Sequence, residues 1–280
     1  MYYIFRATTR QLLQRIRAVG AIGVTFFALF AVPVAAQAAA PLAAEQSLTL
    51  YSPVAGIDMP STPVGPEDVL DKLRRGFELT YEDNNRTAAE LKWFAKHPDY
   101  LNRVFTRAQR YLPYILAELE RRDMPLELAL LPIVESAYDP FAYSHGRAAG
   151  LWQMIPGTAK RFGIKQNWWY DGRRDVVDST RAALDYLEYL EDLNDGNWLN
   201  AIASYNSGEG NVLRAARKNR KAGKNIDFWY LKLPKETSMY VPKLLALVEI
   251  VADPAKYNLT LPVVPNEQQF VVTDIDTQLD

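Results

Sequence analysis

Residues 126–136 read Leu-Glu-Leu-Ala-Leu-Leu-Pro-Ile-Val-Glu-Ser, an apolar run that carries a carboxylate near its end. Leu128, Leu131 and Glu135 are spaced by three and four residues, so they lie on one face of a helix. Burial of Glu135 among leucines disfavours its charged form and raises its pKa, which a general acid working near neutral pH requires. A structural ion pair with Arg121 or Arg122 is the alternative interpretation of this segment alone.

Helical periodicity extends outward from this segment over most of the chain. Pro132 predicts a bend just before Glu135, because proline lacks the N–H that would bind the carbonyl of Leu128. Asp123 and Pro125 predict the start of that helix by N-cap and first-turn preference. Apolar stripes predict further helices over 66–77, 86–96, 98–116, 156–162, 178–193, 197–206, 209–219 and 236–252. We therefore expect one mostly α (all-α) domain without an internal repeat.

The first 38 residues have the order of basic, apolar and small residues that is typical of a secretory signal peptide. Four arginines precede an apolar stretch over 18–36, and no acidic residue lies among them. Small residues follow the stretch. We predict cleavage after Ala36 or Ala38, with an uncleaved membrane anchor as the alternative. The absence of cysteine excludes disulfides, thiol nucleophiles and the acylated cysteine of a lipoprotein. We therefore expect an exported protein of the periplasm or cell envelope.

Composition excludes several classes of function. Two histidines and no cysteine provide no zinc-like ligand set, and we expect neither a metal nor another cofactor. The sequence contains no glycine-rich phosphate loop. A net charge of −1 gives no general attraction to nucleic acid, and the basic run over 214–224 is interpreted as a solvated helix end or as a surface that meets carboxylates of a ligand. The sixteen tyrosines and six tryptophans fit a sugar-binding groove and equally a large helical core.

Three further segments combine polar or aromatic residues with glycines or a helix start. Residues 144–156 read Ser-His-Gly-Arg-Ala-Ala-Gly-Leu-Trp-Gln-Met-Ile-Pro, in which Gln153 offers both a donor and an acceptor. Tyr205 and Asn206 end a predicted helix at the sequence Tyr-Asn-Ser-Gly-Glu-Gly. Tyr240 lies near the start of another helix, in Glu-Thr-Ser-Met-Tyr-Val-Pro. Each segment alone has an ordinary structural explanation, as a loop, a helix stop or a helix start.

Taken together, the order and spacing of the segments resemble the soluble lytic transglycosylase (SLT) family. The motifs are Glu-Ser-Ala-Tyr-Asp-Pro from Glu135, Gly-Leu-Trp-Gln-Met-Ile-Pro-Gly-Thr-Ala from Gly150, Tyr-Asn-Ser-Gly-Glu-Gly from Tyr205 and Glu-Thr-x-x-Tyr-Val-Pro from Glu236. The resemblance runs from about residue 66 to 262, and segments 170–177 and 227–229 relate it most to a membrane-bound branch of the family. That branch commonly carries C-terminal LysM repeats and a lipid anchor. This sequence shows neither, so we expect at most a loose association with membrane or wall.

The resemblance implies a lysozyme-like α fold with a groove for peptidoglycan and Glu135 as the sole general acid/base. The implied reaction cleaves the β-1,4 bond between N-acetylmuramic acid and N-acetylglucosamine and forms 1,6-anhydro-N-acetylmuramic acid. The substrate's own N-acetyl group would replace the second carboxylate that most glycosidases use. Tyr205 and Tyr240 are the candidates for orienting Glu135. The residues matched to substrate binding are Ser136, Ser144, Gln153, Ile155, Tyr205, Asn206 and Tyr240, and family members often carry methionine where Ile155 stands.

Two other functions stay open at this point: a goose-type lysozyme-like hydrolase, which adds water, and a non-catalytic wall-binding protein. A hydrolase needs a second carboxylate, and Asp139 lies only four residues after Glu135. Its place before Pro140 indicates turn chemistry instead.

These features predict five parts of the chain. They are a signal peptide (1–38), a linker rich in alanine, serine and proline (39–65), an N-terminal helical region (66–122), the SLT domain (123–262) and a C-terminal tail (263–280). We expect the tail to be truncated. We also expect a monomer whose partner is the glycan strand of peptidoglycan and not nucleic acid.

Overall fold

A computed structural model describes residues 67–271 of the chain. The predicted signal peptide (1–38), the predicted linker (39–65) and the end of the C-terminal tail lie outside the described residues. The chain divides into two units between Pro60 and Ser61, and every described residue belongs to the second. No helix within 67–271 is long and apolar enough to cross a bilayer.

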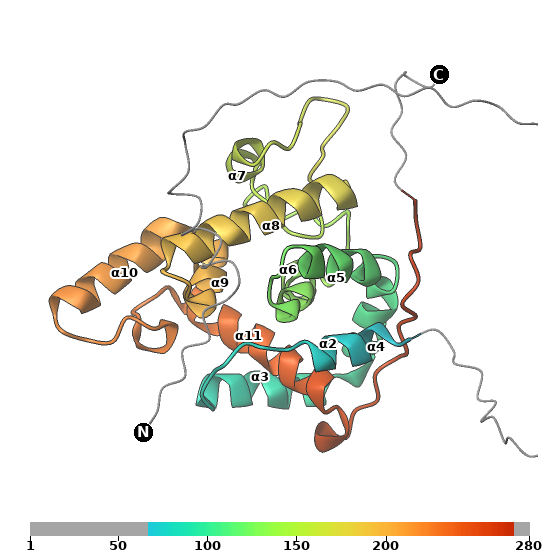
Figure 1. The fold of residues 1–280 in the computed structure, drawn as a ribbon, viewed down its shortest axis with the longest axis horizontal. Coiled ribbons are helices and arrows are strands. Elements are labelled where there is room, and N and C mark those ends of the chain that lie inside the picture. Colours follow the sequence, from blue (N-terminus) through green and yellow to red (C-terminus); the bar gives the residue numbers. More distant parts are fainter. Residues whose placement is uncertain (1–66, 272–280) are drawn as a thin grey trace, which may run out of the picture. The chain divides into compact units, whose positions relative to one another are not determined.

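The regular secondary structure of residues 67–271 is helical, and the only β pairing in this part of the chain is a few isolated bridges. The expected mostly α fold is therefore confirmed. The α-helices are α2 (Val69–Arg75), α3 (Asn85–Ala95), α4 (Pro98–Ala108), α5 (Leu112–Arg121), α6 (Leu131–Ser136), α7 (Pro156–Arg161), α8 (Val176–Leu193), α9 (Trp198–Ser207), α10 (Glu209–Lys221) and α11 (Lys235–Ala252), shown in Figure 1. Short 3-10 turns are η1 (Leu126–Leu130), η2 (Phe228–Tyr230) and η3 (Ala255–Tyr257).

Side-chain caps set the starts of four of these helices. Asp68, Asn84, Asp175 and Asn197 each accept a backbone N–H from the first turn of α2, α3, α8 and α9. Such caps satisfy amides that have no partner within the helix. The predicted helices over 156–162, 178–193, 197–206, 209–219 and 236–252 agree with the structure to within two residues at each end.

The long helix predicted over 98–116 is wrong, because the structure divides it into α4 and α5. Pro113 lies in the first turn of α5. A proline in mid-helix lacks the N–H for the carbonyl four residues earlier and its ring collides with that carbonyl, so the chain turns between Ala108 and Leu112 before a new helix starts. The apolar spacing runs through the break, because both helices bury their stripes in one core.

The predicted start at Asp123 is also wrong. Asp123 has a φ of 55° just after α5, and Pro125 occupies the cap position of η1. Pro132 does not bend one continuous helix. It stands in the first turn of α6, after η1 has ended, so the tight 3-10 turn passes into a separate α-helix.

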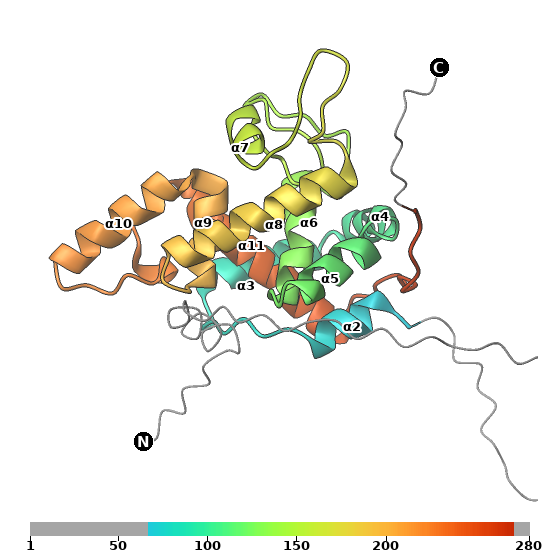
Figure 2. The same ribbon diagram turned by 45° about the horizontal axis from the view of Figure 1, so that its top comes forward.

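Helices α3 and α11 pack against each other along much of their lengths, as Figures 1 and 2 show from two sides. Arg86 of α3 joins them: its guanidinium donates to the carbonyl of Ser238 (3.1 Å) and lies over the ring of Trp229, 5.0 Å from the ring centre. Buried side chains from both predicted segments, 66–122 and 123–262, form one core. The N-terminal helices therefore support the elements that carry the sequence motifs.

The two ends of the described chain also meet. The amide of Val69 donates to the carbonyl of Val264 (2.8 Å), and the amide of Asn266 donates to the carbonyl of Glu67 (2.8 Å). Asp68 caps α2 and accepts the amide of Val264 as well. The first residues of the predicted tail thus hold the start of α2 in place.

Glu127 of η1 is buried in the core and binds the segment that precedes α3. Its carboxylate is fully buried and accepts the amides of Glu78 and Leu79, both at 2.7 Å. Burial raises the pKa of Glu127, and the two amide bonds oppose that shift. We expect Glu127→Ala to lower the free energy of unfolding by about 2 kcal/mol, because two amides lose their acceptor.

Urea denaturation would measure this loss. The control is Glu127→Gln, which keeps a carbonyl acceptor and is expected to retain most of the stability. Equal unfolding midpoints for Glu127→Ala and the native chain would contradict this role.

Candidate active site

Glu135 lies in the last turn of α6, and the local backbone explains why the helix ends there. Ala137 has a φ of 51°, and its amide and that of Tyr138 return to the carbonyls of Ile133 and Pro132. The Tyr138 ring is fully buried, and its hydroxyl donates to the carbonyl of Ala129 at 2.6 Å. This anchored turn directs the Glu135 side chain away from the core and into a cavity.

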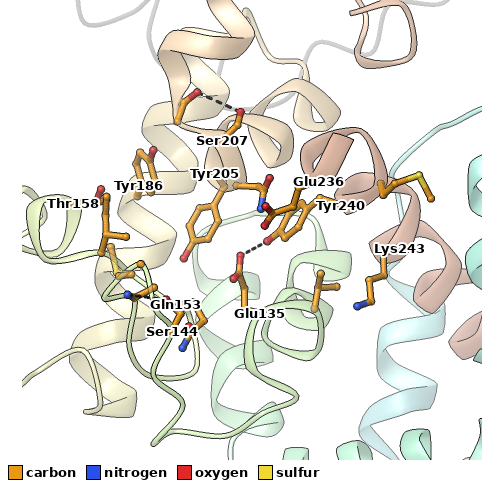
Figure 3. A pocket seen from close by; sticks show the side chains of 18 of the residues that line it. Glu135, Ser144, Gln153, Thr158, Tyr186, Tyr205, Ser207, Glu236, Tyr240 and Lys243 are labelled. Carbon is orange, nitrogen blue, oxygen red and sulfur yellow. Dashed lines mark hydrogen bonds between the residues drawn. The ribbon is translucent and has the colours of Figure 1, made fainter. Parts of the chain in front are cut away.

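The cavity has a volume of about 1070 Å³ and lies between α6, α9, α11 and the segment from residue 144 to α7. Figure 3 shows Glu135 at its centre, with Tyr205 and Tyr240 pointing toward it from two different helices. Six of the predicted site residues line this one cavity together with Glu135. They are Ser144, Gln153, Ile155, Tyr205, Asn206 and Tyr240.

The Glu135 carboxylate is half-buried, and burial raises its pKa to about 7. The hydroxyl of Tyr240 donates to one oxygen of the carboxylate and partly opposes that shift. Glu236 raises the pKa further and Lys243 lowers it. A carboxyl group with this pKa is protonated in a large fraction of molecules near neutral pH, as a general acid must be. The alternative of an ion pair with Arg121 or Arg122 is wrong, because those arginines pair with Glu118, Asp185 and Glu188.

Tyr240 and Tyr205 differ in what their hydroxyls bind. Tyr240 contacts the carboxylate directly, whereas the Tyr205 hydroxyl donates to the carbonyl of Trp152 at 2.8 Å. Glu135 and Tyr205 are still close enough for the carboxylate to raise the pKa of the tyrosine, after burial as the main cause. Tyr205 therefore joins α9 to the loop carrying Gln153 and presents its ring to the cavity.

The amide nitrogen of Gln153 donates to the carbonyls of Gly150 (2.9 Å) and Ala142 (3.2 Å). Only the amide oxygen is then left for a ligand, so Gln153 is an acceptor for an external N–H or O–H. Ser144 uses its hydroxyl oxygen to accept the amide of Ala148 at 3.1 Å. Ile155 is 50% exposed at the cavity edge, where it offers an apolar contact.

Ser136 is the predicted site residue that the structure does not bring to the cavity wall. Its hydroxyl lies within hydrogen-bonding distance of the carbonyls of Leu151 (2.9 Å) and Pro132 (3.2 Å). The residue thus ties the end of α6 to the loop before Gln153. Asp139 does not line the cavity either, and its carboxylate accepts the amide of Phe141 at 2.9 Å, as expected for a turn.

Several lining residues were not identified from the sequence. Tyr186 of α8 stands on the same side of the cavity as Gln153 in Figure 3, and its hydroxyl donates to Glu209 at 3.2 Å. Glu236 and Lys243 flank Tyr240 on α11, four residues before it and three residues after it in sequence. The helical spacing around Tyr240 could have identified them. Glu90 of α3 also lines the cavity, and no local sequence signal marks it.

A buried arginine holds the loop that forms one cavity wall. The Arg173 side chain is 6% exposed and pairs with Asp171 through two nitrogens, at 2.6 and 2.8 Å. It also donates to the carbonyls of Arg147 (2.5 Å) and Met154 (3.0 Å). Gly150 has a φ of 80°, and a Cβ at this position would collide with the carbonyl of Arg173. The loop can therefore lie this close only with glycine there.

No group of three or more histidine, cysteine or acidic side chains within 67–271 is arranged to hold a metal ion. The carboxylate, amides, hydroxyls and aromatic rings of the cavity can bind a neutral polar ligand and exchange a proton with it.

This chain is similar in sequence to one protein family and to several known proteins. The family described as "Transglycosylase SLT domain" matches residues 113–228. Membrane-bound lytic murein transglycosylase D of Escherichia coli K12 is 46% identical over 192 residues, which cover 69% of this chain and 42% of that protein. A protein of Alteromonas sp. strain M-1, named "Putative tributyltin chloride resistance protein", is 41% identical over 186 residues, covering 65% of this chain and 88% of that protein.

Among solved structures, an inactive mutant of the lytic transglycosylase Slt from Pseudomonas aeruginosa is similar, with 20% identity and a TM-score of 0.42. That match covers 57% of this chain and 26% of the solved one. The aligned part of this chain thus spans less than half the length of the Escherichia coli protein and most of the Alteromonas protein. The resemblance predicted from the four motifs is confirmed: this chain belongs to the transglycosylase SLT family.

Proposed function

We propose that the protein is a lytic transglycosylase of the cell envelope that cleaves peptidoglycan strands. The bond broken is the β-1,4 link between N-acetylmuramic acid and N-acetylglucosamine, and the product ends in 1,6-anhydro-N-acetylmuramic acid. The observation that carries the proposal is Glu135, a half-buried carboxyl group with a pKa of about 7, bound by Tyr240 at the centre of a cavity. The name of the Escherichia coli relative, a lytic murein transglycosylase, supports it.

In the first step, protonated Glu135 donates its proton to the oxygen that links the two sugars, and the bond from C1 to that oxygen breaks. Tyr240 binds Oε1, which leaves Oε2 free to carry the proton. N-acetylglucosamine leaves with a hydroxyl at C4. The N-acetyl group of the muramic residue stabilises the positive centre at C1, so no protein nucleophile is required.

In the second step, the Glu135 carboxylate accepts the proton of the muramic C6 hydroxyl as O6 bonds to C1. This step restores the carboxylic acid and consumes no water. A single group with a pKa near 7 suits both roles, because it gives up and regains a proton with little cost near neutral pH.

The remaining wall residues would hold the sugars in place. The Gln153 amide oxygen is suited to accept the N–H of an N-acetyl group, since the amide nitrogen is occupied. Asn206 can offer a donor and an acceptor from the opposite helix. Ser136 would act indirectly, by fixing the end of α6.

Product analysis separates this proposal from its two alternatives. Incubation of purified sacculi with the protein is expected to release muropeptides with anhydro ends, seen by mass spectrometry as a mass one water lower than that of reducing ends. Reducing ends would instead support a goose-type hydrolase. Binding to sacculi without release of any muropeptide would support a wall-binding protein.

The pH dependence of kcat/KM follows from the protonation state of Glu135. Activity needs the protonated acid, so kcat/KM is expected to fall as the pH rises above about 7. Glu236→Gln removes a negative charge that raises the Glu135 pKa, so the fall should begin at lower pH. Lys243→Met removes a positive charge that lowers this pKa, so the fall should begin at higher pH. Shifts in the same direction for both variants would contradict the assignment of Glu135 as the acid.

A further inference from the structure

The two sides of the cavity differ in charge. One side, with Ser144, Gln153, Thr158 and Tyr186, is made of hydroxyls, an amide and an aromatic ring, and its one carboxylate, Glu209, is paired with Arg161. Across Glu135, Figure 3 shows Glu236 and Lys243 on α11. Lys235 of α11 and Glu90 of α3 line the cavity as well. We call these four ionisable residues, Glu90, Lys235, Glu236 and Lys243, the charged wall.

Helix geometry explains why the charged wall faces the cavity. Glu236, Tyr240 and Lys243 follow one another at intervals of four and three residues, so all lie on one face of α11 with the tyrosine that binds Glu135. Glu90 lies one turn after Arg86 on α3, and Arg86 is bound to the Ser238 carbonyl of α11. The charged wall therefore has a fixed position relative to the catalytic carboxyl.

Two members of the charged wall are half-buried and form no ion pair or hydrogen bond within residues 67–271. Lys243 and Glu90 form no hydrogen bond or ion pair with any residue from 67 to 271, and they do not pair with each other. A partly desolvated charge without a partner lowers the stability of the fold. Such charges are found at sites where a charged ligand supplies the partner. An ammonium and a carboxylate that share a wall but stay apart suit a ligand with both kinds of charge.

The sugars of the glycan carry no charges apart from the lactyl substituent of muramic acid, which is the point where the peptide stem is attached. The stem itself carries free carboxylates and an amino group. The side of the cavity whose only carboxylate is paired matches the sugars, and the charged wall matches the stem. We propose that the charged wall binds the peptide stem of the muramic residue at the cleavage site, with Lys243 pairing with a stem carboxylate and Glu90 with the stem amine. This inference rests on the proposed function.

Helices α3 and α11 both lie outside residues 113–228, the segment matched by the family. Glu135, Gln153, Tyr205 and Asn206 lie inside it. The acid Glu135 thus lies in the matched segment, whereas Tyr240, which binds it, and the charged wall lie on helices outside that segment.

The experiment compares kcat/KM on two substrates: strands with intact stems, and the same strands after an amidase has removed the stems and the lactyl carboxyl groups that this frees have been converted to methylamides. The readout is the ratio of the two values at one pH. Changes in the Glu135 pKa cancel in this ratio, because both substrates use the same acid. The native chain is expected to prefer strands with stems about tenfold. Lys243→Met should bring the ratio close to one, and Lys243→Arg should largely preserve it.

A second arm tests Glu90. Acetylation of the stem amines removes their charge, and it is expected to lower kcat/KM of the native chain but not of Glu90→Gln. Lys92→Met is the matched control, since Lys92 is exposed on α3 and does not line the cavity. Acetylation of the stem amines should lower kcat/KM of Lys92→Met by the same factor as that of the native chain.

The outcomes separate the two levels of the proposal. Cleavage of both substrates with equal kcat/KM would overturn the charged-wall inference and leave the proposed function intact. A ratio that falls in Lys218→Met, in the basic run of α10, but not in Lys243→Met would also overturn it, because the stem would then bind elsewhere. Cleavage of neither substrate would overturn the proposed function and this inference with it.

Discussion

Glu135→Gln is expected to lower kcat/KM on peptidoglycan strands by about a thousandfold or more, because in the proposed reaction one group supplies both the acid and the base. Glutamine has the same shape and can still accept the hydroxyl of Tyr240, so the cavity should keep its geometry. It cannot give a proton to the leaving oxygen or take one from the C6 hydroxyl. The measurement is the initial rate of anhydro-muropeptide release from sacculi, quantified by mass spectrometry.

The control for this experiment is Glu120→Gln, which removes a surface carboxylate paired with Lys72 and outside the cavity. It should keep the activity of the native chain. Thermal unfolding shows whether each variant is folded, and Glu135→Gln should be no less stable, since it removes a charge from a partly desolvated site. Retention of more than a tenth of the native rate by a folded Glu135→Gln would overturn the assignment of the acid.

Local sequence patterns predicted most of the helices, because apolar spacing and caps act within a few residues. The error over residues 98–116 occurred because the same apolar stripe allows two arrangements, and a proline decides between them. The stripe from Leu101 to Leu116 fits one long helix as well as two packed in the same core. Only the conflict between Pro113 and the carbonyl four residues earlier separates them.

Sequence motifs likewise predicted several of the residues that line the cavity, because each motif is local in sequence. Glu135, Gln153, Asn206 and Tyr240 lie within motifs, and one cavity receives all four. The sequence did not predict that the Tyr205 hydroxyl binds the Trp152 carbonyl, because that bond depends on how α9 packs against a loop. Which residues of α3 line the cavity depends still more on how the helices pack.

Glu90 illustrates this limit. It is 45 residues away from Glu135 in sequence and reaches the cavity because α3 packs along α11, where Arg86 binds the carbonyl of Ser238. No motif connects these positions. Contacts between helices that are distant in sequence are therefore the part of the site that requires the structure.

Arg173→Met is expected to lower the free energy of unfolding by about 3–5 kcal/mol, the usual cost of removing one partner of a buried ion pair. The Arg173 side chain is 6% exposed and pairs with Asp171, whose pKa it lowers. The carbonyls of Arg147 and Met154 lose a donor in the same variant. Chemical denaturation with a constant m-value would measure the loss, and Arg174→Met, at the exposed neighbouring position, is the control.

A second variant identifies the cause of that loss. If the unpaired Asp171 carboxylate is responsible for much of it, the double variant Arg173→Met with Asp171→Asn should be more stable than Arg173→Met alone. Arg173→Lys should recover only part of the stability, because an ammonium cannot reproduce the two-nitrogen contact with Asp171 and still reach both carbonyls. Since Arg173 holds the loop of Gln153, activity should fall with stability in these variants. A stable, fully active Arg173→Met would mean that the wall of the cavity is held by Gly150 and Ser136 without the arginine.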